Sequence, residues 1–242
     1  MIEVVDLYKK FGRQEILKGV NLRIEKGQTF ALIGGSGNGK SVLLKHIIGL
    51  MKPDKGSIMI GTEDITRLRG RRLRAIKDRL GIVFQFGALF DSLTIYENVA
   101  FPLKEKTKLS EAQIKEKVFK ELEAVQLLED RDKYPAQISG GMRKRVALAR
   151  CLIMNPEIIF FDEPTTGLDP VIAKIIYNTI RSLQEKRRLT ALIVSHEIPG
   201  IFQIVDRVAM LHGGKIISTG TPEEIQASTN PTVQKFLKGE LE

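Results

Sequence analysis

Apolar and polar residues alternate along the first part of the chain, with short turn signals between the alternating stretches. Val20-Asn-Leu-Arg-Ile24, followed by Glu-Lys-Gly27, is a clear example within residues 2 to 30. A period of two residues is typical of a strand with one buried face. The pattern therefore predicts a small antiparallel sheet near the amino terminus.

Uninterrupted apolar runs recur further along, and segments with helical spacing separate them. Such runs are typical of strands that are buried on both faces in a parallel sheet. The predicted buried strands are Thr29–Ile33, Gly81–Phe84, Ile158–Phe161 and Thr190–Val194. The predicted helices are Val42–Leu50, a basic helix between Gly61 and Gly81, a helix running to about Met154, and one starting at Pro170. This alternation indicates an α/β fold.

The segment between about residues 86 and 154 has a different character. Phe86–Phe90 and Leu93–Tyr96 look like apolar loops, and residues 110 to 129 have helical spacing with many Lys and Glu. We expect a helical subdomain here, inserted into a single domain of residues 1–242 whose α/β core and β subdomain comprise about 1–85 and 155–242. The aromatic residues Phe86 and Phe90 fit a docking surface and the core of the insert equally well.

The composition of the 242-residue chain, 43% hydrophobic and 28% charged, is that of an ordinary globular protein. No apolar run approaches the roughly 18 residues that span a bilayer, and Met1 leads directly into a strand-like stretch rather than a signal peptide. We therefore expect a chain that neither crosses a membrane nor leaves the cytoplasm by itself.

The formal net charge of +9 raises the question of polyanionic partners. Its densest cluster consists of Arg67, Arg69, Arg71, Arg72, Arg74, Lys77 and Arg79. A solvated helix face, an anionic membrane surface and a nucleic acid all fit such a cluster. We expect no nucleic acid, because no aromatic residues lie between the basic ones to stack on bases.

Candidate chemistry begins at Gly34-Gly-Ser-Gly-Asn-Gly-Lys40-Ser41, which fits the phosphate-binding loop G-x-x-x-x-G-K-[ST] between a strand and a helix. Its glycines allow backbone N–H groups to face an anion. Lys40 would contact the β- and γ-phosphates and Ser41 would bind Mg²⁺. The predicted nucleotide-binding residues are Phe11, Gly34, Gly35, Ser36, Gly37, Asn38, Gly39, Lys40, Ser41 and Val42. Phe11 could stack on adenine, with Tyr8 as a competitor and core packing as the alternative.

Polar residues also follow three of the predicted buried strands. Gln85 follows the first of these, Asp162-Glu163 the second, and Ser195-His196 the third. Because ligands of open α/β sheets bind at the carboxyl ends of the strands, we expect these side chains at the nucleotide site. Asp162 would bind Mg²⁺, Glu163 would polarise water, Gln85 would touch either, and His196 would contact the γ-phosphate. A helix cap and a structural histidine are the alternatives.

A second anion site is predicted at Ser139-Gly140-Gly141, at the start of a helix that continues through Met142. Taken together, these motifs resemble the full ordered set of an ABC-type ATPase: Walker A, Q-loop, signature, Walker B, D-loop (Gly167–Asp169) and switch histidine. The resemblance implies a P-loop NTPase (RecA-like) core, bound ATP and Mg²⁺, and a head-to-tail homodimer in which Ser139–Met142 face the ATP of the partner. It also implies catalytic roles for Glu163, His196 and Gln85, and metal contacts for Ser41, Gln85 and Asp162.

A narrower resemblance concerns Phe84–Thr94 and Glu97–Leu103, together with Met142 in place of the usual signature glutamine. These residues are similar to those of the ATPases of the Mla/Mce phospholipid transport systems. The resemblance implies an energy-coupling subunit that moves phospholipids between inner and outer membranes and maintains outer-membrane lipid asymmetry.

It further implies a peripheral location on the cytoplasmic face of the bacterial inner membrane, under a multi-span permease. A small regulatory subunit and an Mce-domain lipid-binding protein are further expected partners. Thr165–Asp169 has the general importer form and carries no lipid signal. An importer ATPase for another solute and a soluble ABC ATPase of iron–sulfur cluster assembly therefore stay open as alternatives.

Overall fold

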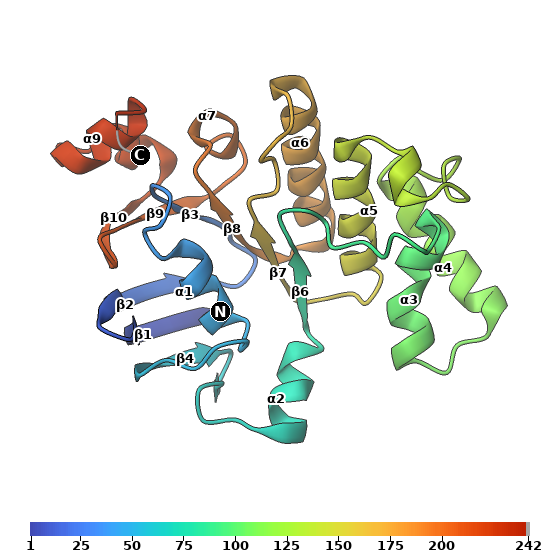
Figure 1. The fold of residues 1–242 in the computed structure, drawn as a ribbon, viewed down its shortest axis with the longest axis horizontal. Helices are drawn as coiled ribbons and strands as arrows, with labels where there is room; N and C mark the ends of the chain where they lie inside the picture. Colours follow the sequence, from blue (N-terminus) through green and yellow to red (C-terminus); the bar gives the residue numbers. More distant parts are fainter. Residues whose placement is uncertain (241–242) are drawn as a thin grey trace.

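Two β-sheets, with helices packed on and beyond the larger one, make up the fold (Figure 1). The structure is a computed structural model and describes residues 1–240. One sheet has four strands in the order β2-β1-β4-β5, and the other has six strands in the order β10-β9-β3-β8-β7-β6. This arrangement confirms the predicted α/β class with an antiparallel sheet at the amino terminus.

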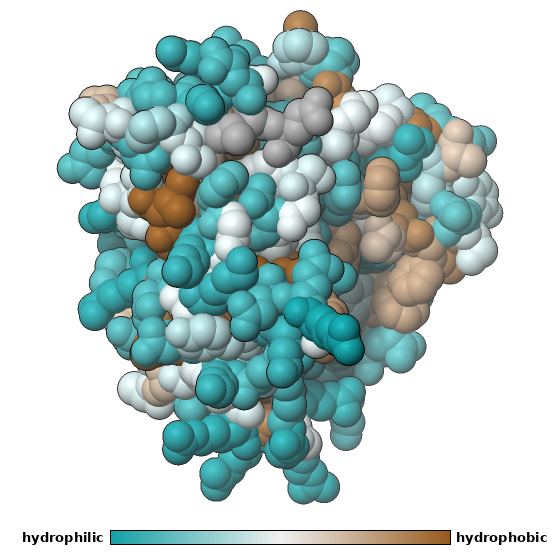
Figure 2. All heavy atoms as spheres, turned by 60° about the vertical axis from the view of Figure 1, so that its left-hand side comes forward, coloured by the Kyte–Doolittle hydropathy of each residue, from teal (hydrophilic) through white to brown (hydrophobic). Residues whose placement is uncertain are grey.

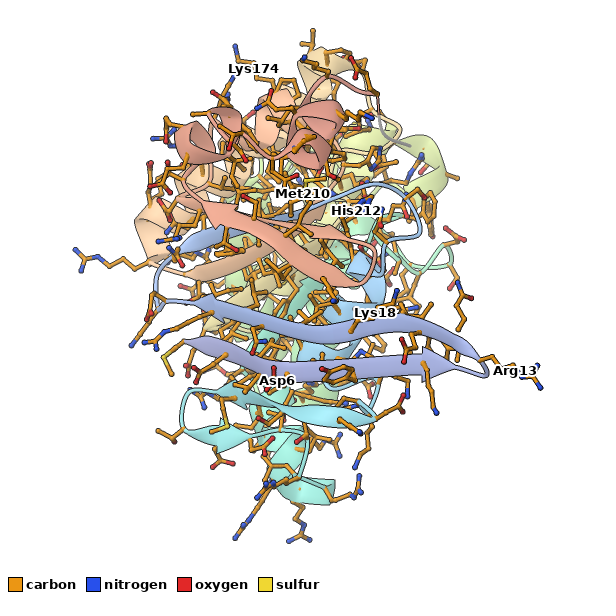
Figure 3. All side chains as sticks on the ribbon, turned by 90° about the vertical axis from the view of Figure 1, so that its left-hand side faces the viewer. Asp6, Arg13, Lys18, Lys174, Met210 and His212 are labelled. Atoms are coloured by element: carbon orange, nitrogen blue, oxygen red, sulfur yellow. The ribbon has the colours of Figure 1, made fainter. Side chains whose placement is uncertain are left out.

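The smaller sheet is antiparallel and pairs β1 (Ile2–Phe11) with both β2 (Gln14–Ile24) and β4 (Lys55–Ile60), while β5 (Glu63–Asp64) extends its edge. The predicted antiparallel sheet covered residues 2 to 30, but Thr29 and Phe30 lie instead in the larger sheet, as part of β3. Figure 3 shows Arg13 at the tip of the β1–β2 hairpin, pointing away from the molecule. The N–H of Lys18 donates to the carbonyl of Gly214 at 2.9 Å, which joins the two sheets where β2 lies beside β10.

Strands β3, β8, β7 and β6 of the larger sheet are parallel, β9 is parallel to β3, and β10 is antiparallel to β9. Their bounds are β3 Thr29–Ile33, β6 Leu80–Val83, β7 Ile158–Asp162, β8 Thr190–Ser195, β9 Arg207–His212 and β10 Lys215–Gly220. Every residue of β3 and β8 is buried. Because both faces of the sheet are covered, these strands read as uninterrupted apolar runs rather than alternating ones.

Alternate residues of β3 and β8 belong to two different hydrophobic clusters. Leu32 and Leu192 pack with α1 (Lys40–Ile47), whereas Ile33 and Ile193 pack with α5 (Gly140–Leu152) and α6 (Pro170–Arg187). Helix α1 therefore covers one face of the sheet, and α5 and α6 cover the other. Because only a short loop separates the end of β3 at Ile33 from Lys40, the start of α1 lies near the carboxyl ends of the strands. Helix α1 begins two residues before the predicted Val42 and ends at Ile47 rather than Leu50.

Helices α3 (Ile95–Lys106) and α4 (Glu111–Ala124) and one side of α5 enclose a third cluster, built of buried residues between 95 and 153. The short η1 (Pro135–Gln137) leads into Ile138, which belongs to this cluster. The prediction of an apolar loop over Leu93–Tyr96 is wrong at its end, because Ile95 already begins α3. Thr94 caps this helix: its Oγ1 accepts from the N–H of Glu97 at 3.2 Å, and Glu97 Oε2 accepts from the N–H of Thr94 at 2.8 Å. The Thr-x-x-Glu spacing is the sequence signal that the apolar pattern hid.

The remaining helices are short: α2 (Gly70–Lys77), α7 (Ile198–Ile201), α8 (Pro222–Gln226) and α9 (Pro231–Leu237). Ile76 is the buried residue of α2, whose basic side chains lie on the surface. In Figure 2 hydrophilic side chains cover the lower end of the molecule, where α2 lies in Figure 1. Two members of the basic cluster are paired, Arg67 with Asp64 at 3.1 Å and Arg79 with Glu157 at 2.6 Å. No helix within residues 1–240 combines the length and apolarity needed to cross a bilayer.

A buried ion pair connects α4 to the end of α6. Arg187 Nη2 donates to both carboxylate oxygens of Glu121 at 2.8 Å, and the two side chains are 24% and 8% exposed. We expect Glu121→Ala to lower the free energy of unfolding by about 2–3 kcal/mol, because it leaves a largely buried cation without its partner. Urea unfolding measures this, with the exposed Glu123→Ala on the same helix as the control. Equal urea midpoints for the two variants would contradict the prediction.

His46 is a buried histidine on α1. Its Nδ1 lies 2.7 Å from the carbonyl oxygen of Val42, and Nε2 is buried without a hydrogen-bond partner among residues 1–240. Burial lowers the pKa of His46 below its ordinary value, with Lys9 adding to this effect and the Val42 hydrogen bond and Asp54 opposing it. Burial therefore favours the neutral form of the imidazole.

We expect the wild-type chain to lose stability on acidification that a His46→Leu variant retains. In the unfolded chain the imidazole protonates near pH 6.5 (about its ordinary pKa), whereas the folded chain takes up this proton at lower pH. Below about pH 6.5 the unfolded state binds more protons than the folded state, so the free energy of unfolding decreases as the pH is lowered. The decrease is at most about 1.4 kcal/mol at about pH 5.5. Urea unfolding at about pH 7.5 and about pH 5.5 measures the difference. Parallel pH dependences of the two proteins would show the prediction to be wrong.

Candidate nucleotide-binding site

An open cleft of about 730 Å³ lies between the start of α1 and the carboxyl ends of the parallel strands. It is lined by Phe11, Ile16, Gly35, Ser36, Gly37, Gly39, Lys40, Ser41, Val42, Gln85, Glu163, His196, Phe236 and Gly239. The structure thus gathers residues from strand ends that are far apart in the sequence. Its volume is within the range of small-molecule sites.

The loop before α1 depends on glycine at two points. Gly34 has a φ of 149°, and a Cβ there would lie 2.2 Å from the carbonyl oxygen of Leu211. Gly39 has a φ of 97° and caps α1, which begins at Lys40. The first N–H groups of a helix have no acceptor within it and carry the positive end of its dipole, so this end of α1 suits an anion. Asn38 Oδ1 accepts from the N–H of Gly213 at 2.9 Å, so this side chain anchors the loop.

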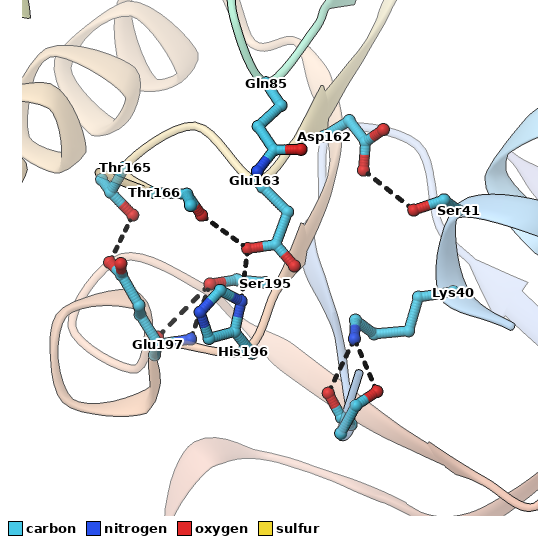
Figure 4. Close-up of polar contacts among 12 residues, drawn as sticks. Lys40, Ser41, Gln85, Asp162, Glu163, Thr165, Thr166, Ser195, His196 and Glu197 are labelled. Atoms are coloured by element: carbon cyan, nitrogen blue, oxygen red, sulfur yellow. Dashed lines mark hydrogen bonds and ion pairs between the residues drawn. The ribbon is translucent and has the colours of Figure 1, made fainter. Parts of the chain in front are cut away.

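Lys40 places a cation at this loop. Its Nζ donates to the carbonyls of Gly34 at 2.7 Å and Gly35 at 2.9 Å (Figure 4). An ammonium has three N–H donors, so one stays free for an oxygen in the cleft. Burial lowers the pKa of Lys40, while the carboxylates of Glu163 and Asp162 act in the opposite direction.

Ser41, the residue after Lys40, places its side-chain oxygen next to that of Asp162. Ser41 Oγ donates to Asp162 Oδ1 at 3.4 Å (Figure 4). Burial raises the pKa of Asp162, as does the neighbouring Glu163. Hydroxyl and carboxylate oxygens suit Mg²⁺, which is commonly held by one or two carboxylates plus substrate phosphates. Residues 1–240 contain no cluster of three or more His, Cys, Asp or Glu side chains able to hold a metal.

Glu163 directly follows β7, and its backbone is strained. Its φ is 52°, and its N–H donates to the carbonyl of Val194 at 2.9 Å. A left-handed conformation at a residue with a side chain costs roughly 1–3 kcal/mol and occurs often at functional sites. Carboxylate oxygen Oε2 lies 2.6 Å from His196 Nδ1 and accepts from Thr166 Oγ1 at 2.8 Å (Figure 4). Both of these side-chain contacts are made by the same carboxylate oxygen, Oε2.

A second polar network, which the sequence did not suggest, lies beneath these residues. Thr165 Oγ1 donates to Glu197 Oε2 at 2.6 Å and lies 2.9 Å from the hydroxyl of Tyr177. The N–H of Glu197 donates to Ser195 Oγ at 3.0 Å. The network joins the loop after β7 to the loop after β8, and so holds Glu163 and His196 at a fixed separation. The sequence feature that could have indicated this network is Glu197, the carboxylate directly after His196.

Of the two aromatic candidates for a base platform, Phe11 lines the cleft and is 47% exposed. Tyr8 is absent from the cleft lining, and its hydroxyl lies against Gly19. Three lining residues escaped the sequence analysis: Ile16 on β2, Phe236 near the end of α9 and Gly239 just beyond it. Nothing in the local sequence marks them, because only packing brings β2 and the carboxyl-terminal helix to the cleft.

The predicted signature residues Ser139–Met142 do not line this cleft. Ser139 is exposed and caps α5, where its Oγ accepts from the N–H of Met142 at 3.3 Å. Gly141 allows α5 and α6 to approach, since a Cβ there would lie 2.5 Å from Ile172 Cγ2. The predicted second anion site is therefore separate from the cleft of its own chain.

The loop after Gln85 carries aromatic side chains at the surface. Phe86 is 83% exposed, and the half-exposed Phe90 packs on Phe101 in a tilted arrangement with ring centroids 4.7 Å apart. Asn98 is fully buried and fixes the loop: its Nδ2 lies 3.0 Å from three carbonyls, including that of Phe90, among which its two N–H groups are shared, and its Oδ1 accepts from the N–H of Phe90. Phe90 is thus partly a packing residue, whereas Phe86 projects freely.

Known proteins resemble this chain over nearly its full length. The family model described as ABC transporter matches residues 17–166. The ATP-binding protein MlaF of the Haemophilus influenzae intermembrane phospholipid transport system is 41% identical over 99% of this chain and 91% of its own. The chloroplastic protein TRIGALACTOSYLDIACYLGLYCEROL 3 of Arabidopsis thaliana is 42% identical over 100% of this chain and 74% of its own.

A solved structure confirms the predicted P-loop NTPase fold. The ATP-binding cassette MJ0796, in a dimeric post-hydrolysis state bound to ADP and Pi, matches with a TM-score of 0.83 and 32% identity, over 92% of this chain and 99% of that one. The motif order, the geometry of the cleft and these matches agree. This chain therefore belongs to the ABC transporter family, as an ATP-binding subunit that hydrolyses ATP.

Proposed function

We propose that this chain is the energy-coupling ATPase of a phospholipid transport system. The observation that carries the proposal is the 41% identity with a phospholipid transport ATPase over 99% of this chain and 91% of the relative. The same system would place the chain at the cytoplasmic face of the bacterial inner membrane, under a multi-span permease. Its cycle would move phospholipid between the inner and outer membranes and maintain outer-membrane lipid asymmetry.

The cleft supports a specific mode of ATP binding. Lys40 and the N–H groups at the start of α1 hold the β- and γ-phosphates, and the ring of Phe11 stacks on the adenine. Ser41, Asp162 and Gln85 hold Mg²⁺, which neutralises charge on the phosphates when bound. The oxygen atoms of these three side chains are of the type that Mg²⁺ prefers.

Hydrolysis then depends on one proton acceptor. Glu163 Oε1 takes a proton from the attacking water, while His196 and Thr166 hold the carboxylate through Oε2. Because Nδ1 of His196 faces Glu163, its Nε2 is left for a γ-phosphate oxygen. Gln85 orients the water or the metal from the neighbouring strand end.

Two copies of the chain are needed for the complete site. Ser139–Met142 are outside the cleft of their own chain, and their helix start suits an anion. In a head-to-tail homodimer these residues close over the nucleotide that the partner holds, and add hydrogen-bond donors where charge develops in the transition state. The dimeric cassette with 32% identity supports this arrangement.

The exposed Phe86 and the loop around it supply an apolar surface next to Gln85, which fits contact with the permease. A small regulatory subunit and an Mce-domain lipid-binding protein complete the proposed assembly. Phospholipid selection would reside in these partners, since the cleft described above is a nucleotide site.

Affinity purification of the tagged chain from detergent-solubilised membranes tests this function, with untagged cells as the control. We expect mass spectrometry to identify a multi-span permease, an Mce-domain protein and bound phospholipid. Recovery with a solute-specific permease, or with soluble iron–sulfur assembly proteins and no membrane protein, would overturn the lipid assignment and leave the ATPase chemistry intact.

A further inference from the structure

A buried lysine that neither the motifs nor the proposed mechanism uses lies next to the catalytic residues. Lys144, on α5, is 8% exposed. Its Nζ donates to the backbone carbonyl of Gln85 at close range and to that of Glu163 at 3.3 Å. These two carbonyls belong to the loops after β6 and β7, so a single ammonium connects both loops to α5.

The rest of the loop after Gln85 also rests on α5. Arg150 donates through Nη2 to the carbonyl of Gly87 at 2.7 Å and through Nη1 to that of Ala88 at 2.8 Å. A Cβ at Gly87 would lie 3.4 Å from Ala147, so this backbone lies directly against the helix. Lys144, Ala147 and Arg150 thus form one face of α5, and the loop after Gln85 packs against this face. Of these three residues, Lys144 is the one that also contacts Glu163.

The burial of Lys144 has an energetic cost that its surroundings offset. Burial lowers its pKa, whereas the negative charges of Glu163, Glu197 and Asp162 act against this shift. A buried cation is tolerated only where it is paired or hydrogen-bonded. An apolar side chain would fill the same space without this cost, which indicates that the hydrogen bonds to the two carbonyls have a role of their own.

Lys144 lies close to the start of α5, where the predicted signature residues are. The helix starts at Gly140, and Lys144 lies about one turn further on. The same turn of helix therefore carries the signature residues at one end and the link to Gln85 and Glu163 on its side. A displacement of about 1 Å at a reacting group can cost about a hundredfold in rate, so a link that fixes the backbone of Glu163 affects catalysis directly.

We propose that Lys144 is a positioning residue for ATP hydrolysis, which holds the backbone of Gln85 and Glu163 in register with the amino end of α5. The inference rests on the catalytic roles proposed for those two residues. Lys144 is not among the residues that line the cleft, and its contacts with Gln85 and Glu163 are with backbone carbonyls rather than with their side chains. Its effect is therefore on kcat rather than on ATP binding.

The test compares steady-state ATP hydrolysis and fluorescent-ATP affinity for Lys144→Met, Lys144→Gln and Lys144→Arg. We expect kcat of Lys144→Met to fall at least about tenfold, because misplacement of a reacting group slows the chemical step, with Kd for ATP within about twofold. Lys144→Arg keeps charged donors and should recover part of the rate that Lys144→Met loses. The kcat of Lys144→Gln should lie between those of Lys144→Met and Lys144→Arg. If Lys144→Met does not fold, the Gln and Arg variants still give the ordered series.

Arg145→Met is the matched control. Arg145 is the next residue on α5 and donates to the carbonyl of Val125 at 2.7 Å. Its replacement also removes a partly buried cation, but one that contacts the segment after α4 rather than the loops of Gln85 and Glu163. We expect its kcat to stay within about twofold of wild type. A Lys144→Met enzyme with wild-type kcat would overturn the inference. So would a loss of rate that Arg145→Met shares and Lys144→Arg does not recover.

Glu163→Gln in the same assay separates this inference from the mechanism on which it rests. If Glu163→Gln loses turnover while the Lys144 variants keep it, only the positioning role is wrong. If Glu163→Gln keeps turnover, the proposed base is wrong, whatever the Lys144 variants show.

Discussion

Glu163→Gln is expected to bind ATP normally and to lose nearly all hydrolysis, with kcat reduced about 10²–10⁴-fold. The amide has the shape of the carboxylate and can still meet Thr166 and His196, but it cannot take a proton from water. With binding intact and turnover blocked, the variant should accumulate as an ATP-bound dimer. Phosphate release at saturating ATP measures the first effect, and size-exclusion chromatography with ATP measures the second.

The exposed Glu123→Gln, on α4, is the control for the loss of one carboxylate. Thr166→Ala provides a graded comparison, because it removes one of the two contacts to Oε2 and leaves the carboxylate in place. We expect a smaller loss of kcat for Thr166→Ala than for Glu163→Gln. Unchanged turnover of Glu163→Gln would exclude Glu163 as the base.

Lys40→Ala is expected to lose nucleotide binding itself. Charge-assisted hydrogen bonds contribute about 1.5–3 kcal/mol each, so affinity for ATP should fall about 10- to 100-fold or more. The variant also removes the links to Gly34 and Gly35, which hold the loop in shape. A fluorescent-ATP titration measures the effect.

Lys45→Ala is the matched control, since Lys45 lies on the same helix and is exposed. It should bind ATP close to wild type. Thermal unfolding of both variants shows whether the loss at Lys40 reflects binding rather than folding. Retained affinity in a folded Lys40→Ala protein would contradict the assignment.

The predictions that succeeded from sequence rest on signals carried by neighbouring residues. The apolar run Thr29–Ile33 marked a strand buried on both faces, and the structure places it in the middle of the parallel sheet. The spacing from Gly34 to Ser41 predicted a loop between β3 and α1, and the structure places residues of that loop in the lining of the cleft. The start of α3 at Ile95 was missed, although the Thr94-x-x-Glu97 signal was present, because its apolar residues suggested a loop.

The sequence by itself determined the α/β class, the order of the motifs and the chemistry of each candidate residue, because turn-forming glycines, apolar periodicity and residue type act within a few positions of the chain. The tertiary structure alone decided that Glu163 Oε2 lies against His196, and that Phe11 rather than Tyr8 lines the cleft. It alone placed Lys144 on the carbonyls of Gln85 and Glu163. Such contacts depend on the register of parallel strands and on how α5 packs across their ends. No local pattern encodes that packing, because it arises from the burial of both sheet faces together.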